Sequence, residues 1–166
     1  MARWCARCGA QVTVWDSREN PPRAAALQAE VPAASRIAAL PASLTAAPLL
    51  ILKSPGLSPL DPAVAPLLEQ ARAAGVAVLG ELDLFVRALA DLKADRGYAP
   101  RVLAVTGTNG KTPTTAMAAL LVQRSGRSVV AAGNIGPALL DTLSAHWDAL
   151  PEVWVLELSS FQLEGG

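Results

Sequence analysis

Short, mostly apolar runs recur along the chain, and each is followed by a polar or glycine-bearing break. Such runs, bounded by turn residues, are typical of buried strands. Between most of them lie segments with helical spacing, and in the segment from Asp61 to Ala74 we expect Asp61 to cap a helix with Pro62 in its first turn. Strands alternating with helices predict a parallel sheet covered on both faces, so the expected class is α/β. The predicted strands are Val12–Trp15, Leu49–Leu52, Val76–Leu79, Val102–Val105, Val129–Ala132 and Val153–Leu158.

The polar stretch from Asp91 to Pro100 contains Gly and Pro and separates two sets of strand–helix units. It predicts a domain boundary, with one domain over residues 1–95 and a second over residues 96–166. The region from Glu19 to Ala47 is rich in Ala and Pro, and we expect one short helix there with irregular connections.

Composition narrows the class of protein. The chain is 52% apolar and 17% charged, and its 14 basic and 14 acidic residues give a formal net charge of zero. These values predict a soluble globular protein with no affinity for nucleic acid or acidic membranes. No apolar run is long enough to span a membrane, and the first residues do not resemble a signal peptide, so we expect a cytoplasmic protein.

The two cysteines, Cys5 and Cys8, form a lone C-x-x-C pair without the second ligand pair of a structural zinc site. We interpret them as reduced, inert thiols on a helix, with redox or metal roles as the alternatives.

The strongest chemical signal is the segment that follows the strand ending at Val105. Gly107, Thr108, Asn109 and Gly110 form a glycine-bearing turn, and Lys111 and Thr112 open a segment with helical character. Such a turn directs backbone N–H groups and the positive end of a helix at phosphate. Lys111 is expected to reach the outer phosphates of ATP, and the Thr112 hydroxyl to bind Mg²⁺.

The loop departs from the usual P-loop pattern at one position. The pattern has a glycine five residues before Gly110, where this chain has Val105. A P-loop kinase or GTPase is therefore a weaker interpretation, and the GTP-reading sequence Asn-Lys-x-Asp is also absent. Pro113 falls in the first turn of the helix, where a missing N–H is tolerated, although it can donate nothing to a phosphate.

Three segments together resemble the Mur ligase family, the ATP-dependent amide-forming enzymes of bacterial cell-wall precursor synthesis. The loop from Thr106 to Thr112 is similar to the ATP loop of the family. Gly133–Gly136 and Leu156–Glu164 are most similar to the members that add D-glutamate. In the first part of the chain, Asp16–Arg18, Ser54–Gly56 and Gly80–Phe85 resemble segments of the family's uridine-nucleotide domain.

The resemblance implies a Rossmann-like first domain followed by the start of a P-loop-type ATPase domain with a parallel sheet. It also implies ATP and Mg²⁺ as cofactors, and UDP-N-acetylmuramoyl-L-alanine and D-glutamate as substrates, joined through an acyl phosphate by a protein that is monomeric at full length. Lys111 and Glu157 would be the catalytic residues, with Thr112 and Glu157 as metal ligands. The implied substrate-binding residues are Ser17, Arg18, Gly56, Asn134, Ser159 and Gln162.

Several of these residues also have simpler interpretations. Glu157 ends an apolar strand, where ligands of open α/β sheets collect, but it could merely end the strand with its side chain in water. Asn134 between glycines could be a turn residue, and only the resemblance favours a binding role. Asp16 after a strand suits ribose binding or a turn equally well, and Arg18 suits a diphosphate or a solvated surface.

Compared with the family, the chain is expected to lack the first strand with its glycine turn, and the parts that follow Gly166. The resemblance places there a metal-binding His, a modified Lys, further strands and a C-terminal domain. We therefore expect a fragment with weak nucleotide binding and no ligase turnover, and with an unpaired apolar sheet edge that makes it unstable or prone to associate. The alternatives are another Mur-type amino-acid ligase and a non-catalytic nucleotide-binding module.

Overall fold

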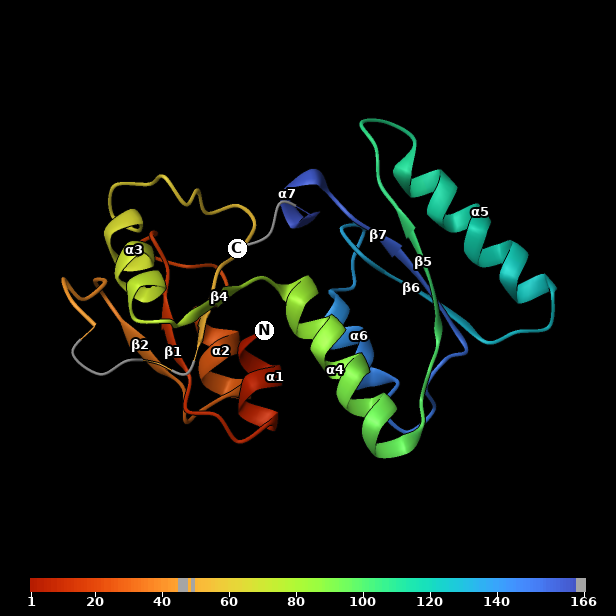
Figure 1. Ribbon diagram of the computed structural model, residues 1–166, viewed down its shortest axis with the longest axis horizontal. Helices are drawn as coiled ribbons and strands as arrows, with labels where there is room; N and C mark the ends of the chain where they lie inside the picture. The colour runs from red at the N-terminus through yellow and green to blue at the C-terminus, as the bar shows by residue number, and fades with distance from the viewer. Residues whose placement is uncertain (45–47, 49, 164–166) are drawn as a thin grey trace. The chain divides into compact units, whose positions relative to one another are not determined.

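The computed structural model of the chain describes residues 1–44, 48 and 50–163 (Figure 1). By their contacts these residues form two compact units. One comprises residues 1–53 and 57–79, and the other comprises residues 54–56 and those from 80 onward. Every strand pair in the two units is parallel, which confirms the predicted α/β class. Within the described residues, no helix is long and apolar enough to cross a membrane.

The first unit has two parallel strand pairs, β1 with β2 and β3 with β4, each three residues long. Helix α3 packs next to β4 and buries one face, made by Leu67, Leu68 and Ala71. The elements of this unit are α1 (Ala2–Arg7), β1 (Thr13–Trp15), α2 (Ala24–Glu30), β2 (Ser35–Ile37), β3 (Leu50–Leu52), α3 (Ala65–Ala73) and β4 (Ala77–Leu79).

The second unit is a three-layer arrangement around a sheet with the strand order β5-β7-β6. Helix α5 lies on one face of this sheet, and α4 and α6 lie together on the other (Figure 1). Its elements are α4 (Glu81–Arg96), β5 (Arg101–Val105), α5 (Lys111–Arg124), β6 (Val129–Gly133), α6 (Leu139–Ala145), β7 (Val153–Glu157) and α7 (Ser160–Leu163).

Strand β7 forms the core of the second unit, because all five of its residues are buried. The Trp154 ring meets Phe85 of α4 edge-on, with 5.1 Å between ring centroids. The indole Nε1–H donates to the Tyr98 hydroxyl at 2.8 Å, and that hydroxyl donates to the Pro151 carbonyl at 2.6 Å. The buried indole is thus satisfied, as a polar group in a core must be.

All six predicted strands are present, although Leu49 of the predicted strand Leu49–Leu52 lies outside the described residues. The predicted helix between Glu19 and Ala47 is α2, with residues 45–47 of that region also outside the described part. Strand β2 was not predicted, because its sequence Ser-Arg-Ile lacks an apolar run.

Helix α3 begins later than predicted. Its N-cap is Val64, because Asp61 forms a turn of its own instead of capping the helix. The Asp61 Oδ1 atom accepts from the backbone N–H of Ala63 at 2.9 Å, and the Asp61 carbonyl accepts from Val64 at 2.9 Å. Asp side chains commonly bond the backbone two residues on, which competes with helix capping.

The strand that ends in Glu157 lies in the middle of its sheet, so the apolar edge expected after it belongs to a different strand. Among the described residues, β5 and β6 are the edges of the sheet. Val102 and Leu103 of β5 are 45% and 44% exposed, whereas β7 is buried throughout. The exposed apolar edge is therefore β5.

Helix α4 groups by its contacts with the second unit, because it packs on α6 and supplies Phe85 to the core around Trp154. The compact units thus divide near residue 80. The division into domains at residues 95 and 96 concerns the organisation of the family, and it stays a prediction.

Candidate functional site

The predicted phosphate loop connects β5 to the first residue of α5. Gly107 and Gly110 have φ angles of 142° and 74°, which only glycine adopts readily, and Gly110 is the N-cap of the helix. The loop is exposed from Thr106 to Gly110, so its backbone N–H groups and the amino end of a 14-residue helix are accessible to an anion. The ordering of strand, glycine turn and helix is as predicted.

Lys111 folds back over the loop, and its Nζ donates to the Gly107 carbonyl at 2.7 Å. This contact holds the ammonium group above the turn, where it has two further N–H donors for a phosphate oxygen. Thr112 and Pro113 are exposed in the first turn of α5, as predicted for Pro113.

Glu157 is buried at the carboxyl end of β7, with an exposed fraction of 2%. Its Oε1 atom accepts a hydrogen bond from Asn134 Nδ2 at 3.1 Å, and its carbonyl accepts from the Asn134 backbone N–H at 2.9 Å. The interpretation that the Glu157 side chain lies in water is therefore wrong. Asn134 is also more than a turn residue, because it bonds this carboxylate.

Close backbone approach explains why glycine precedes Asn134. A Cβ atom at Gly133 would lie 2.3 Å from the Glu157 carbonyl oxygen, and the φ angle of 113° already disfavours other residues. The chain therefore brings Asn134 to Glu157 only because residue 133 has no side chain.

The ends of the three strands meet at one edge of the sheet. Glu157 is in register with Val105 on one side and with Gly133 on the other, and the Leu158 N–H donates to the Val105 carbonyl at 2.9 Å. The phosphate loop begins after Val105. The structure thus brings the start of that loop, Asn134 and Glu157 together at the carboxyl edge, where parallel α/β sheets bind ligands.

The carboxylate of Glu157 suits a hard cation. Its Oε2 atom is buried, and no hydrogen-bond partner exists for it in the described part of the chain. The described residues contain no group of three or more His, Cys, Asp or Glu side chains that could hold a metal. A single carboxylate is nevertheless typical of Mg²⁺ sites that also use waters and substrate phosphates. The donor set fits Mg²⁺ held together with a nucleotide.

Ser159 and Gln162 form hydrogen bonds with each other. The Ser159 N–H donates to Gln162 Oε1 at 2.9 Å, and the Gln162 N–H donates to Ser159 Oγ at 3.3 Å, which forms a capping box at the start of α7. The Ser-x-x-Gln spacing in the sequence could have predicted this pairing. Contact of these side chains with a substrate stays a prediction.

In the first unit, Arg18 pairs with Asp16. The two side chains form two hydrogen bonds, from Arg18 Nε to Oδ1 at 2.8 Å and from Nη2 to Oδ2 at 2.7 Å. The hydrogen bonds from Arg18 lower the pKa of Asp16 to about 2. Ser17 and Gly56 are exposed, and no neighbouring atom requires a glycine at position 56. The roles of these four residues in nucleotide binding stay predictions.

Three buried polar residues, Lys53, Thr115 and Thr142, were not singled out from the sequence. Lys53 is 8% exposed at the end of β3, and its Nζ donates to the Leu57 carbonyl at 3.3 Å. Thr115 is fully buried, and its Oγ1 atom has no hydrogen-bond partner among the described residues. The sequence carries no signal for these residues, because the burial of a single polar residue depends on packing.

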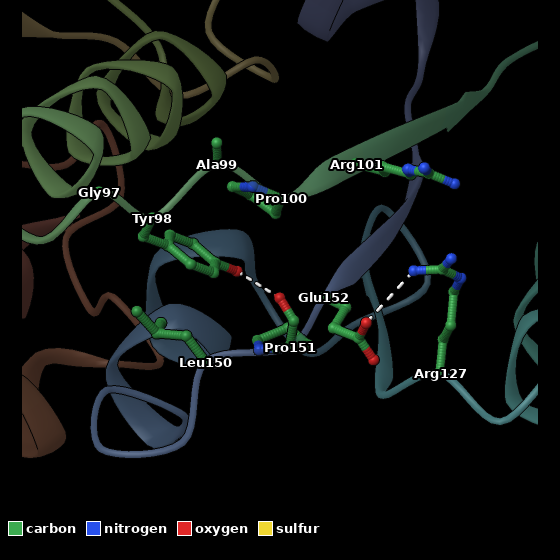
Figure 2. Close-up of a pocket in the computed structure, with 9 residues that line it drawn as sticks. All are labelled: Gly97, Tyr98, Ala99, Pro100, Arg101, Arg127, Leu150, Pro151 and Glu152. Carbon is green, nitrogen blue, oxygen red and sulfur yellow. Dashed lines mark hydrogen bonds and ion pairs between the residues drawn. The ribbon is translucent and has the colours of Figure 1, made fainter.

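A separate cavity of about 340 Å³ lies at the opposite, amino ends of β5 and β7 (Figure 2). An ion pair between Arg127 Nη1 and Glu152 Oε1 at 3.2 Å lies on one side of the cavity. The hydrogen bond from the Tyr98 hydroxyl to the Pro151 carbonyl lies on another side. Burial raises the pKa of Tyr98. None of the predicted site residues lines this cavity, so it is distinct from the site at the carboxyl edge.

Comparison with known proteins bears on the part of the chain that contains Ser17, Arg18 and Gly56. Residues 1–80 match the family described as Mur ligase MurD-like, N-terminal domain. These residues are thus similar to the N-terminal domain of Mur ligases. The resemblance seen in the sequence is thereby confirmed over the first 80 residues of the chain.

The similarity to Mur ligases extends over almost the whole chain. The chain is 62% identical to UDP-N-acetylmuramoylalanine--D-glutamate ligase of Albidiferax ferrireducens, over 99% of the chain and 33% of that protein. The proteins of the same name from Ralstonia nicotianae and Burkholderia cenocepacia are 60% and 55% identical over 99% of the chain, and it covers 34% and 33% of them. The chain thus spans about a third of the length of the curated relatives it matches.

A solved structure also matches the chain. It is the UDP-N-acetylmuramate:L-alanyl-gamma-D-glutamyl-meso-diaminopimelate ligase from Neisseria meningitides. The match has a TM-score of 0.46 and 16% identity, and it covers 95% of this chain and 48% of the other.

Proposed function

We propose that this chain forms the nucleotide-binding part of an ATP-dependent ligase that joins D-glutamate to UDP-N-acetylmuramoyl-L-alanine. The observation that carries the proposal is the identity of 55–62%, over 99% of the chain, to relatives named for that activity. The geometry at the carboxyl edge supports it, because a phosphate loop and a buried carboxylate meet there.

In the proposed reaction, the substrate carboxylate attacks the γ-phosphorus of ATP and ADP leaves, which forms an acyl phosphate. The amine of D-glutamate then attacks the acyl carbon, phosphate leaves, and the nitrogen loses a proton to form the amide. Phosphoryl transfer needs positioning and charge neutralisation more than covalent help from the protein.

Each residue of the loop then has a task. The backbone N–H groups from Gly107 to Gly110 and the amino end of α5 hold the phosphate oxygens, and Lys111 neutralises charge on the transferred group. Thr112 and Glu157 hold Mg²⁺, which supplies a positive charge to the phosphates when bound. Asn134 fixes the orientation of the Glu157 carboxylate through the 3.1 Å hydrogen bond.

The substrate side completes the proposal. Ser17, Arg18 and Gly56 contact the uridine diphosphate, and Ser159 and Gln162 lie on the muramoyl side of the site. Residues 1–95 form the uridine-nucleotide domain, and residues 96–166 belong to the ATP-binding domain. At full length, the protein acts as a monomer in the cytoplasm.

Release of phosphate from ATP tests the choice of substrate. A complete ligase that contains this chain as its nucleotide-binding part is incubated with UDP-N-acetylmuramoyl-L-alanine and, in separate reactions, D-glutamate, L-glutamate, L-lysine or diaminopimelate. We expect release with D-glutamate alone. Release with another amino acid would assign a different Mur-type ligase, and nucleotide binding without release under any condition would assign a non-catalytic module.

A further inference from the structure

Two buried oxygen atoms in the second unit have no hydrogen-bond partner in the described part of the chain, namely Thr115 Oγ1 and Glu157 Oε2. Thr115 is 0% exposed and Glu157 is 2% exposed. A buried hydroxyl or carboxylate without a partner is costly, so native proteins rarely retain one without a reason. The hydroxyl can donate and the carboxylate can accept, so one water between them satisfies both.

The alternation of β7 places both groups on the same face of the sheet. Trp154 contacts Phe85 of α4, so its side chain points to the face that α4 and α6 cover. Successive side chains of a strand point to opposite faces, which directs Val153, Val155 and Glu157 toward α5. Figure 1 shows α5 on that other face.

The position of Thr115 along α5 also places it near the end of β7 that carries Glu157. Helix α5 starts at the carboxyl edge of the sheet with Lys111, and Thr115 lies about one turn further on. Thr115 is the one residue of α5 that is buried. A threonine inside a helix often bonds the carbonyl four residues earlier, but here the hydroxyl has not taken that bond.

We infer that Thr115 is a positioning residue for Glu157. Its hydroxyl and Glu157 Oε2 share one bridging water, while Asn134 donates to Oε1. The carboxylate is then fixed from both sides. Its part in orienting Glu157 toward Mg²⁺ rests on the proposed function, whereas the contact between Thr115 and Glu157 does not.

Thermal unfolding of the chain without ligand tests the contact. Thr115→Val keeps the shape of the side chain and removes the hydroxyl, so we expect the unfolding midpoint to fall by about 3 °C. Thr115→Ser retains a hydroxyl, so its midpoint should stay close to that of the unsubstituted chain. Thr114 is the exposed neighbour, so Thr114→Val is the matched control and should leave the midpoint unchanged. If the hydroxyl serves no partner, Thr115→Val will instead raise the midpoint, and this result overturns the inference.

Repeating the unfolding test in the variant Glu157→Met shows whether the effect of Thr115 depends on Glu157. In Glu157→Met the acceptor is gone, so adding Thr115→Val should no longer lower the midpoint. Equal decreases in both backgrounds would show that the hydroxyl acts through another group, and would contradict the inference.

Titration of Mg²⁺ in the presence of ATP, followed by calorimetry, tests the role at the metal. Groups that orient a metal ligand typically contribute about tenfold or more to affinity. We expect Thr115→Val to weaken Mg²⁺ binding about tenfold, and Thr114→Val and Thr115→Ser to change it little. Unchanged affinity in Thr115→Val contradicts the role at the metal. If the unsubstituted chain binds no MgATP, the proposed function fails, while the unfolding measurements still decide the contact.

Discussion

The side chains of Asp16 and Arg18 show how a local ion pair changes a carboxyl group near a predicted ligand site. The pair is two residues apart in one turn, and the Arg18 backbone N–H also donates to Asp16 Oδ1 at 3.0 Å. All three hydrogen bonds favour the charged carboxylate, which is why the pKa of Asp16 falls from 3.8 to about 2. In the proposed diphosphate site, Arg18 would use only the N–H groups that Asp16 leaves free.

The lowered pKa predicts the pH dependence of this turn. Because the pKa is lower in the folded chain than in the unfolded one, the pair contributes stability above pH 3.8. That contribution is lost as the pH falls from 3.8 to about 2. NMR titration of the Asp16 carboxyl carbon should give a pKa of about 2, and Arg18→Met should return it toward 3.8. A pKa near 3.8 in the unsubstituted chain would contradict the pairing.

Glu157 illustrates what the sequence can and cannot predict about single residues. Its place at the end of an apolar strand was evident from the run Val153–Leu158. Its burial, and its bond to Asn134 some 23 residues away, depend on the pairing of β6 with β7. A single sequence does not contain that pairing, so the resemblance to a family was needed to favour a role for Asn134.

Strands β6 and β7 approach each other closely at Gly133, where the backbone leaves no room for a side chain. The 2.3 Å distance from an added Cβ to the Glu157 carbonyl oxygen is far shorter than any normal contact. The position of Asn134 depends on this approach, because its N–H bonds the same carbonyl.

Gly133→Ala should therefore separate the two strand ends. We expect a loss of about 3 kcal/mol or more in the free energy of unfolding, from backbone strain together with the clash. Gly126→Ala is the matched control, because Gly126 also has a positive φ of 82° but no atom within 4 Å of the added Cβ. It should cost only about 1 kcal/mol. Urea unfolding measures both, and equal costs would contradict the close approach.

The secondary structure followed from apolar runs wherever those runs were continuous. The prediction failed at β2, whose three residues Ser-Arg-Ile gain strand structure only by pairing with β1. It also placed the start of α3 too early, because the sequence does not show whether Asp61 caps a helix or closes a turn. These errors arise where tertiary pairing or turn chemistry overrides local preference.

The order of strands in the second unit decides which surfaces of the whole chain are exposed. Because β7 enters between β5 and β6, the most apolar strand is fully covered, and β5 lies at an edge. Leu120 and Leu121 of α5 are also exposed, by 45% and 67%. Parallel pairing was predictable from the alternation of strands and helices. The order β5-β7-β6 was not, because apolar runs do not specify neighbours.

An exposed apolar edge strand predicts self-association. Sedimentation velocity of the chain should show concentration-dependent association, and Val102→Lys should weaken it by placing a charge on that edge. Val86→Lys is the matched control, because Val86 is 57% exposed on α4, away from the edge. Equal behaviour of the two variants would show that the β5 edge is not the surface involved.

The proposed function depends on binding of the ATP phosphates by the loop from Gly107 to Thr112. Calorimetric titration with MgATP measures this binding in the unsubstituted chain, in Lys111→Ala, and in the control Arg124→Ala. Arg124 is an exposed cation in the last turn of the same helix. We predict binding by the unsubstituted chain and by Arg124→Ala, and affinity at least about tenfold weaker in Lys111→Ala, since a charge-assisted bond contributes about 1.5–3 kcal/mol. No binding by the unsubstituted chain, or equal affinity in all three, would contradict the proposed binding.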